Sequence, residues 1–493
     1  MDVLGSTTVF LVISLLFLVA WKKTAAKRKN LPPGPTPLPI IGNLLQLKTD
    51  NMKENLKKMS EKYGPVFMVY FGSDQTVVLY GYDIVKKVLV DRGDEFLDRG
   101  SFPSSDKASR GLGLFMANGE GWVQVRRFSL STLRNFGMGK KSIEERIQEE
   151  AEYFVKALRA KKGQPFNPAT LCSGATSNVI NHILLGERFD YQDEEFVQVL
   201  RLLSDSLRLE SSASGQLYNI FPRIMDYLPG PHQRFFKNLH EIRDFITKKV
   251  KDHEETLDLT GIPRDFADSF LLKMEQEKHN PKTVFTRENL IVIIFDLFLA
   301  GTETTAISLR YIFMILLEHP AVEAKIHEEI DRVIGQERPP AMKDRPEMPY
   351  TEAVIHEVQR FLDLIPLGFV RVVKQDMEFE GFTIPKGATI YPILSSVLHD
   401  SKQYKNPSQF DPEHFLDEKG HFKKNGADMP FSAGKRNCLG EGLARMQHFL
   451  FLTTILQSFR LKHPPGVTKI NLTPEISGIT NIPHQVTFCF SPR

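Results

Sequence analysis

The segment Pro430–Gly440 constrains this chain most, because it places one cysteine in a glycine-flanked loop just before a long apolar helix pattern. It reads Pro-Phe-Ser-Ala-Gly-Lys-Arg-Asn-Cys-Leu-Gly, so that Cys438 lies between Gly434 and Gly440. Glycine permits a tight turn that brings backbone close to a flat ligand. The N–H groups and positive dipole end of the following helix favour a thiolate over a thiol. The segment therefore predicts a loop that offers a thiolate to an iron atom.

The other two cysteines, Cys172 and Cys489, each lie in an ordinary core-like run. A lone cysteine is most often a small buried hydrophobe, and we predict that role for both. Three cysteines cannot build a disulfide framework, so the sequence favours a reducing compartment.

A second unusual segment is Ala300–Thr305, which interrupts the apolar helix pattern Glu288–Leu317 with an acid and three threonines. Such β-branched polar residues weaken helix interiors. A threonine hydroxyl can donate to the carbonyl one turn earlier, and beside Gly301 this bond would bend the helix and open a groove. The bond can serve structure alone, or the groove can hold dioxygen and water.

A third pattern is Glu357 and Arg360, which lie three residues apart in the helix pattern Thr351–Leu362. Their side chains share one helix face and can pair. The spacing is common by chance, so a solvated surface pair is a strong alternative to a functional or structural one.

The composition is that of an ordinary globular protein, with 41% hydrophobic and 25% charged residues. A net charge of +3, with no zinc-type spacing and no arginine-rich tract in the body of the chain, gives no reason to expect nucleic-acid binding. The 493 residues could hold about three domains. No polar or low-complexity linker divides residues 60–493, however.

The N-terminal run Val3–Trp21 is apolar, and as a helix it would span roughly 28 Å, about the thickness of a bilayer core. A cleaved signal peptide is the alternative. Basic residues follow the run instead of preceding it, and no small-x-small cleavage site is visible. We predict an uncleaved transmembrane anchor at residues 1–21, with the rest of the chain in the cytosol. A basic, proline-rich linker at residues 22–43 would then orient a body at 44–493, because proline at this density favours a stiff extended segment.

Helix periodicity dominates the body, and two pairs of short runs alternate like strands. The predicted helices are Glu144–Leu158, Ala175–Leu185, Phe235–Asp252, Glu288–Leu317, Ala321–Val333, Thr351–Leu362 and Glu441–Phe459; the predicted strands are Val66–Phe71, Thr76–Tyr80, Phe379–Phe382 and Thr389–Tyr391. The apolar, proline-broken run Leu217–Phe236 should not form one helix. Core packing is one interpretation of that run, and a mobile lid that touches the membrane is the one we favour.

These motifs resemble the cytochrome P-450 superfamily, the haem-thiolate monooxygenases, and in detail the vertebrate microsomal branch called family two. The resemblance extends from Leu31 to Phe490. It implies a mainly α fold with a small β-rich lobe, one large domain, and haem b held through Cys438. It also implies that Thr304 positions oxygen and a water, that Glu303 helps to bring in protons, and that Glu357 and Arg360 support folding. The residues that carry the resemblance are Phe431, Gly434, Arg436, Cys438, Gly440, Glu303 and Thr304.

The resemblance further assigns the haem propionates and the substrate pocket. Trp122 and Arg126 are one helical turn apart, so both could reach one carboxylate. The family's Pro-Glu-x-Phe segment has His414 where many members have arginine, which could change its tie to Glu357. The predicted propionate residues are Arg99, Trp122, Arg126, Arg371 and Arg436, and the predicted pocket residues are Phe115, Met116, Phe298, Leu299, Ala300, Ile365, Leu367, Phe369 and Ile479. The pocket favours lipophilic, neutral substrates. Arg110 could add a preference for anions or could be an exposed helix-end arginine.

No Gly-x-Gly-x-x-Gly fingerprint for NADPH or flavin follows a predicted strand, so electrons must come from another protein. By resemblance this is an NADPH–cytochrome reductase, with cytochrome b5 as a further candidate, at the endoplasmic reticulum membrane. The candidate docking residues are Arg126, Arg127, Arg134, Lys140, Lys141, Lys435 and Arg445, although scattered solvated charge is the alternative.

Two other classes remain as alternatives, an oxygen-independent haem-thiolate isomerase or dehydratase and a membrane-anchored haem carrier without turnover. Neither needs the Glu303–Thr304 pair that this chain keeps. The sequence leaves the substrate open among drugs, fatty acids and steroids.

Overall fold

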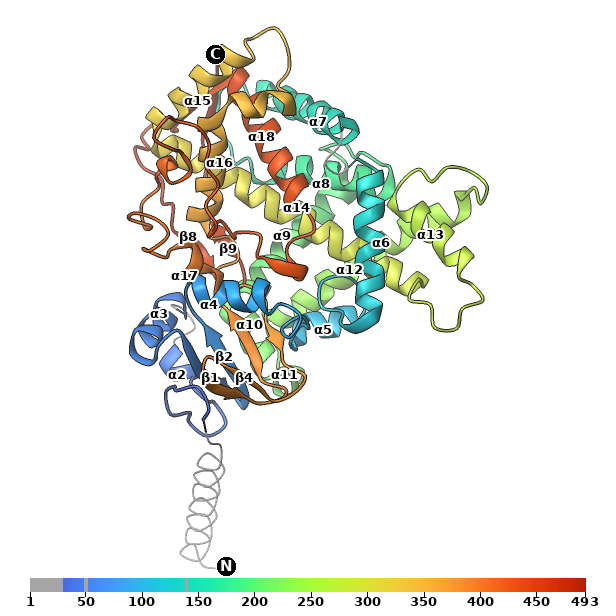
Figure 1. Ribbon diagram of the computed structural model, residues 1–493. Helices are drawn as coiled ribbons and strands as arrows, with labels where there is room; N and C mark the ends of the chain where they lie inside the picture. Colours follow the sequence, from blue (N-terminus) through green and yellow to red (C-terminus); the bar gives the residue numbers. More distant parts are fainter. Residues whose placement is uncertain (1–29, 48–51, 138–140) are drawn as a thin grey trace, which may run out of the picture.

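The computed structural model describes residues 30–47, 52–137 and 141–493 as a large helical body with a small β-rich lobe, which confirms the predicted fold class (Figure 1). The predicted anchor at residues 1–21 and the first part of the linker lie outside the described residues. The helices are α2 Leu44–Leu47, α3 Met52–Tyr63, α4 Tyr82–Lys86, α5 Pro103–Ser109, α6 Gly119–Asn135, α7 Lys141–Ala160, α8 Ala169–Leu185, α9 Glu194–Ser211, α10 Ala213–Ile220, α11 Pro222–Met225, α12 Pro231–Thr256, α13 Phe266–Gln276, α14 Arg287–Glu318, α15 Pro320–Val333, α16 Pro349–Leu362, α17 Leu394–Leu398 and α18 Glu441–Ser458.

Helix α14 runs through the centre of the body and organises its core. Thr286 caps its N-terminus by accepting a hydrogen bond from the N–H of Asn289. The helix is apolar around most of its circumference, as expected of a buried core helix. It packs most closely on α8 and also contacts α12, α16 and α18. Among the described residues it is the one helix long and apolar enough to cross a membrane, but its burial inside the protein identifies it as a core element.

The β-rich lobe is built on a four-stranded sheet in the order β1-β2-β6-β3. Strand β1 pairs antiparallel with β2 from Val66 opposite Leu79, which confirms the predicted hairpin, and β2 pairs parallel with β6. Helices α2 and α3 lie beside this sheet (Figure 1). The strands are β1 Val66–Phe71, β2 Asp74–Leu79, β3 Arg371–Val372, β4 Met377–Phe379, β5 Phe382–Ile384, β6 Thr389–Pro392, β7 Phe459–Lys462, β8 Pro474–Ser477, β9 Asn481–Pro483 and β10 Cys489–Pro492.

One predicted strand was wrong. Phe379–Phe382 is not a strand but the turn of a hairpin, in which β4 ends at Phe379 and β5 begins at Phe382. Glu380 and Gly381 both have positive φ angles, 50° and 80°, so the chain reverses between them. The alternation that indicated a strand belongs to two short strands on either side of this turn.

The seven predicted helices are confirmed with small changes at their ends. The run Leu217–Phe236 is broken as predicted, because α10 ends at Ile220, α11 begins at Pro222 and α12 begins at Pro231. Its tip exposes Tyr227 and Ile224, with 90% and 59% of their surface accessible, so this part of the run is not core. The segment Leu31–Pro39 is free of helix, as its prolines require. Cys172 and Cys489 are both buried, as predicted.

Candidate functional site

The cysteine loop is fixed by backbone contacts before any ligand is considered. The N–H of Cys438 donates to the carbonyl of Phe431 at 2.9 Å, which closes the loop ahead of α18. Gly434 has a φ of +73°, and a Cβ there would lie 1.8 Å from the carbonyl oxygen of Leu89. Only glycine permits that approach, so the loop is held against the short π-helical segment Lys87–Asp91.

The thiol of Cys438 has surroundings that both oppose and favour its ionisation. Burial raises the pKa of the Cys438 thiol, while the N–H groups of Gly440 and Glu441 and the charge of Arg126 lower it. These N–H groups belong to the start of α18, where the helix dipole favours a negative charge. The side chain nevertheless keeps accessible surface. A cationic partner for the sulfur would therefore tip the balance to the thiolate.

The predicted groove on α14 has its expected hydrogen bond. The hydroxyl of Thr304 donates to the carbonyl of Ala300 at 2.6 Å. Ala300 is exposed although it lies in the middle of the core helix, so α14 presents accessible surface at this point. Glu303 is 3% exposed, and its Oε1 has no hydrogen-bond partner within the described residues. Burial raises the pKa of Glu303, and Ser173 and Arg310 lower it.

Four arginines meet in the space between the lobe and the body, and Asp98, the acid whose charge acts on Arg436, is itself paired with Lys374. Arg99, Arg371 and Arg436 are each at most 9% exposed, and Arg126 is half-buried. They come from four separate elements, and their hydrogen bonds go mainly to backbone carbonyls, as when Arg436 donates to Leu97 and Ala117. In the parts of the chain that the structure describes, none of the four forms an ion pair.

This arginine cluster is costly for the protein alone. Burial and the neighbouring arginines lower the pKa of Arg436 to about 9, and the same two causes lower the pKa of Arg371 to about 10. Among the described residues, Nε of Arg371 and Nη1 of Arg436 have no hydrogen-bond partner. Buried cations normally have an anionic partner. The cluster therefore fits a ligand with two carboxylates, as the propionates of haem would be.

Trp122 and Arg126 lie at this cluster, one turn apart on α6. The Trp122 ring stacks against the Arg436 guanidinium, whose carbon lies 3.4 Å from the ring centroid. Its indole N–H donates to the carbonyl of Leu114 at 3.2 Å. Arg126 donates to the carbonyl of Asn437, next to the cysteine, at 2.9 Å. Their direct contact with a propionate stays a prediction.

Glu357 and Arg360 form a completely buried, bidentate ion pair with two N···O distances of 2.7 Å. The solvated alternative is thereby excluded. Arg360 also donates to three backbone carbonyls between residues 398 and 409. His414 contacts Glu357 at 3.1 Å, so histidine makes the tie for which many family members use arginine. Burial lowers the pKa of His414, but the hydrogen bond to Glu357, the charge of Glu357 and the contact with the Lys405 carbonyl together raise it above its usual value.

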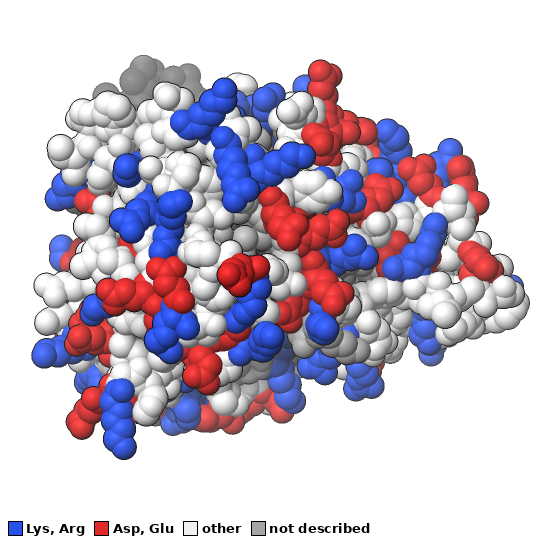
Figure 2. Space-filling view, turned by 90° about the horizontal axis from the view of Figure 1, so that it is seen from above, with Lys and Arg blue, Asp and Glu red and all other residues white. Residues whose placement is uncertain are grey.

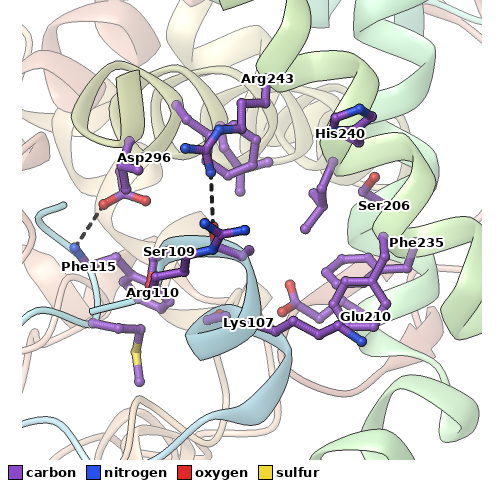
Figure 3. A pocket seen from close by; sticks show the side chains of 18 of the residues that line it. Lys107, Ser109, Arg110, Phe115, Ser206, Glu210, Phe235, His240, Arg243 and Asp296 are labelled. Carbon is purple, nitrogen blue, oxygen red and sulfur yellow. Dashed lines mark hydrogen bonds between the residues drawn. The ribbon is translucent and has the colours of Figure 1, made fainter. Parts of the chain in front are cut away.

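A cavity of about 320 Å³ lies between α5, α9, α12 and α14 (Figure 3). Three of the predicted pocket residues line it, namely Phe115, Met116 and Leu299. Phe369 packs edge-on against Phe115 with ring centroids 4.6 Å apart but is not itself part of the cavity lining. Arg110 also lines the cavity, as the exposed left-handed residue that ends α5.

The other predicted pocket residues are not in the lining of this cavity, and their place in a substrate pocket stays a prediction. Phe298 is 1% exposed and packs towards Phe245 of α12, and Leu367 is buried with the sheet. Ala300, Ile365 and Ile479 are not part of the lining of this cavity. Sequence reasoning missed the polar lining, most of which comes from α5, α9 and α12. The missed lining residues include Lys107, Ser206, Glu210, Phe235, Phe236, Arg243 and Asp296.

The predicted basic docking residues do not all lie at the surface. Arg445 is 7% exposed and contacts His356, Gln359 and Asp428 inside the body, so it is not a surface charge as the docking hypothesis required. Lys435 is exposed but forms an ion pair with Asp94. Lys140 lies outside the described residues. Figure 2 shows basic and acidic side chains interspersed over the face seen from above, in keeping with a net charge of +3.

Comparison with known proteins agrees with this geometry. A model of the cytochrome P450 family matches residues 32–490. The chain is 52% identical to cytochrome P450 2C21 of Canis lupus familiaris over 98% of this chain and 100% of the relative. It is 51% identical to cytochrome P450 2C11 of Rattus norvegicus, over 97% and 95%, and 49% identical to cytochrome P450 2A13 of Homo sapiens, over 99% and 98%. The chain therefore belongs to the cytochrome P450 family of haem-thiolate monooxygenases, and it is similar throughout to the microsomal family-two enzymes.

Proposed function

We propose that this protein is a microsomal monooxygenase that inserts one oxygen atom of O₂ into lipophilic substrates, with electrons supplied from NADPH by a reductase. The observation that carries the proposal is the cluster of buried, unpaired arginines beside the Cys438 loop. A dianionic, iron-containing ring satisfies both features at once, because the sulfur binds the metal and the arginines bind the carboxylates. Haem b, an iron porphyrin with two propionate groups, is the cofactor we propose.

The chain's own residues then divide the work. Cys438 holds the iron, while Arg99, Arg126, Arg371 and Arg436, with Trp122, hold the propionates. Haem ligated by a thiolate supplies the oxidising chemistry, since the sulfur pushes electron density towards O–O cleavage. The Thr304 hydroxyl lies over the Ala300 carbonyl and can exchange that bond for one to a water or an oxygen atom. Glu303, buried with one oxygen unpartnered, can pass protons inward.

The substrate cavity supports a lipophilic substrate. Its apolar lining includes Phe115, Met116, Leu239, Ile291 and Leu299, and a ligand of drug or steroid size buries most of its surface in such a lining. The family-placed residues Phe298, Ala300, Ile365, Leu367, Phe369 and Ile479 complete the proposed pocket as predictions. Whether the physiological substrate is a drug, a fatty acid or a steroid is a question for turnover assays.

We further propose that NADPH–cytochrome reductase docks on the basic residues of α6 and α7 and beside the cysteine loop, and that cytochrome b5 uses the same face. Arg127, Arg134, Lys141 and Lys435 are the surface candidates once Arg445 is removed from the set. Such charges act mainly on the association rate, which falls as salt rises. Charge reversal at Lys141 and Lys435 should slow reduction and flatten its dependence on salt.

The proposed location is the endoplasmic reticulum membrane with the body on the cytosolic side. Residues 1–21 would form the anchor and residues 22–43 the linker, leaving residues 44–493 as the catalytic domain. Exposed apolar side chains support contact of the body with lipid. Ile40 and Leu45 are 69% and 68% exposed, and Ile224 and Tyr227 are exposed at the tip near α11.

The test uses the full chain, expressed with haem and reconstituted with reductase in lipid. The reduced, carbon-monoxide-treated protein should show the far-shifted band of thiolate ligation. NADPH and oxygen should then be consumed with a hydroxylated product from a panel of drugs, steroids and fatty acids. Absence of the band would overturn the haem-thiolate assignment. Product formed without oxygen or NADPH would instead identify an isomerase.

A further inference from the structure

Charged side chains line this cavity together with apolar ones, and two of its cations have an acidic partner within the protein. Lys107 of α5 forms an ion pair with Asp226, and its ammonium lies 4.4 Å from the Phe236 ring centroid. Arg243 of α12 pairs with Glu288 and donates to the carbonyl of Ala108 (Figure 3). These two cations are therefore committed to partners within the protein.

The acids differ from each other. Asp296 of α14 accepts hydrogen bonds from the N–H groups of Leu114 and Phe115, at 2.7 and 3.1 Å, and so fixes the loop before α6. Glu210 of α9 has only one hydrogen bond, donated by the Ser104 hydroxyl to Oε1 at 3.1 Å. Within the described residues, Glu210 is the one acid of the cavity lining that has neither an ion pair nor a backbone N–H to bind, and the exposed Arg110 is the one lining Lys or Arg without an ion pair.

Glu210 lies where a ligand can reach it. Its carboxyl group is enclosed by protein, yet the residue keeps accessible surface and lines the cavity (Figure 3). The cavity extends from Leu299, next to the Ala300–Thr305 segment, to Glu210 near the end of α9. Phe235 and Phe236 line the same cavity, and the Lys107 ammonium beside the Phe236 ring shows that this aromatic wall accommodates a cation. Burial raises the pKa of Glu210 to about 7, so ionised and neutral forms both occur near neutral pH.

An ionised carboxylate without a partner in an apolar cavity is costly, and a bound cation removes that cost. We propose that Glu210 selects, among lipophilic substrates, those that carry a basic amine, which it binds as the ammonium ion while the apolar part lies towards Leu299. Glu210 is thus a residue that determines specificity. This inference rests on the proposed monooxygenase function, but it concerns which substrates bind rather than whether oxygen is inserted.

The test compares the haem-loaded wild-type protein with Glu210→Gln, which keeps the side-chain length and an acceptor for Ser104. The probes are matched pairs of lipophilic compounds, each an alkylamine and its uncharged isostere with carbon in place of nitrogen. Binding is measured from the change in the ferric haem spectrum, and turnover as kcat/KM with reductase. Amines whose nitrogen binds iron directly give a distinct spectrum and are excluded from the set.

We expect Glu210→Gln to weaken binding of the amines by about 10- to 100-fold, with less than a threefold change for the isosteres, because a hydrogen bond to a charged group is the one contact removed. Glu241→Gln, which removes an exposed carboxylate of α12 paired with Lys237 at 3.8 Å, is the matched control and should change neither. Equal losses for both members of each pair would assign Glu210 a structural role and overturn the proposal. So would unchanged amine binding. A wild-type protein that oxidises the isosteres but shows no preference for amines refutes the inference while leaving the proposed function intact.

Discussion

The cofactor region and the substrate cavity are built in opposite ways. Around Cys438 the geometry is set by backbone, through the closing bond to Phe431 and the approach of Gly434 to Leu89, and within the described residues the buried arginines form no ion pair. Around Glu210 the geometry is set by side chains from four helices, and two of the lining cations, Lys107 and Arg243, form ion pairs within the protein. The cofactor region is thus held by backbone contacts and keeps unpaired cations for its ligand. The substrate cavity is shaped by side chains, and two of its cations are already paired.

The largest expected effect follows from removing the sulfur. Cys438→Ser should abolish the far-shifted band of the reduced carbon-monoxide complex and all reductase-dependent product, because a serine oxygen does not donate electron density as a thiolate does. Cys489→Ala, at a buried cysteine of β10, should leave the band unchanged. If Cys438→Ser kept the band, Cys438 would not be the iron ligand.

The buried pair Glu357–Arg360 holds helix α16 to the segment between residues 398 and 414. Glu357→Gln leaves the Arg360 charge buried and should lower the free energy of unfolding by about 3–5 kcal/mol, measured by urea denaturation. Glu145→Gln, which breaks an exposed pair with Lys141 at 3.9 Å, should change it by less than about 1 kcal/mol. If Glu357→Gln does not accumulate, Arg360→Lys, which loses the bidentate geometry, provides the same comparison. Equal free energies of unfolding for the buried-pair and exposed-pair variants would show that the buried pair contributes no more to stability than the exposed one.

The unpaired arginines should matter for the loaded protein and not for the empty one. Arg371→Gln should speed transfer of haem to an acceptor globin by about 10- to 100-fold, a typical effect of groups that orient a metal centre. The unfolding midpoint of the haem-free protein should stay the same or rise, because a buried unpaired cation is removed. Arg460→Gln, at an exposed position of β7, is the control. A less stable haem-free variant would mean that Arg371 serves packing rather than an anion.

Thr304 separates proton delivery from helix packing. Thr304→Ala should lower product per NADPH by about 10-fold or more, with the missing electrons recovered as peroxide, since a group that positions a proton contributes on this scale. Thr453→Ala removes the same kind of bond, from a hydroxyl to the Phe449 carbonyl at 2.7 Å, in α18. If Thr304→Ala formed as much product per NADPH as the wild-type protein, the Thr304 hydroxyl would serve only the structure of α14 through its bond to Ala300.

The smallest effect concerns pH and the cavity. Because burial raises the pKa of Glu210 to about 7, the carboxylate fraction rises from pH 6 to pH 8. Binding of a quaternary ammonium compound, whose charge does not titrate, should strengthen by up to about 10-fold over this interval. The other residues with ionisable side chains that line the same cavity are Lys107, Arg110, His240, Arg243 and Asp296. The pKa of Asp296 is raised by burial to about 6, so Glu210→Gln, which should remove most of the dependence, separates the two acids.

The sequence predicted the cofactor region better than the cavity, and the reason is separation along the chain. The Cys438 loop, the Thr304 bond and the pair Glu357–Arg360 each span a few residues, so spacing alone indicates them. Glu210 meets Ser104, 106 residues earlier in the sequence, and no local pattern announces that contact. Asp296 could have been suspected as an acid within the apolar run of α14.

Errors elsewhere in the prediction have the same origin. The turn at Glu380 was read as strand because two residues suffice to reverse the chain. Helix α9 was missed, although Asp193 accepts a hydrogen bond from the N–H of Phe196 and so caps it, a signal that the sequence contains. Arg445 was placed at the surface because periodicity does not show that His356, 89 residues earlier, lies beside it.

The four arginines also bear on how the β-rich lobe and the helical body come together. Arg371 comes from strand β3 of the lobe and Arg99 precedes α5, whereas Arg126 and Arg436 belong to the helical body. Without an anion, like charges push these parts away from each other, and with one they are drawn onto a common centre. Haem binding would therefore help to hold the lobe on the helical body, because its two carboxylates would lie between cations from both parts.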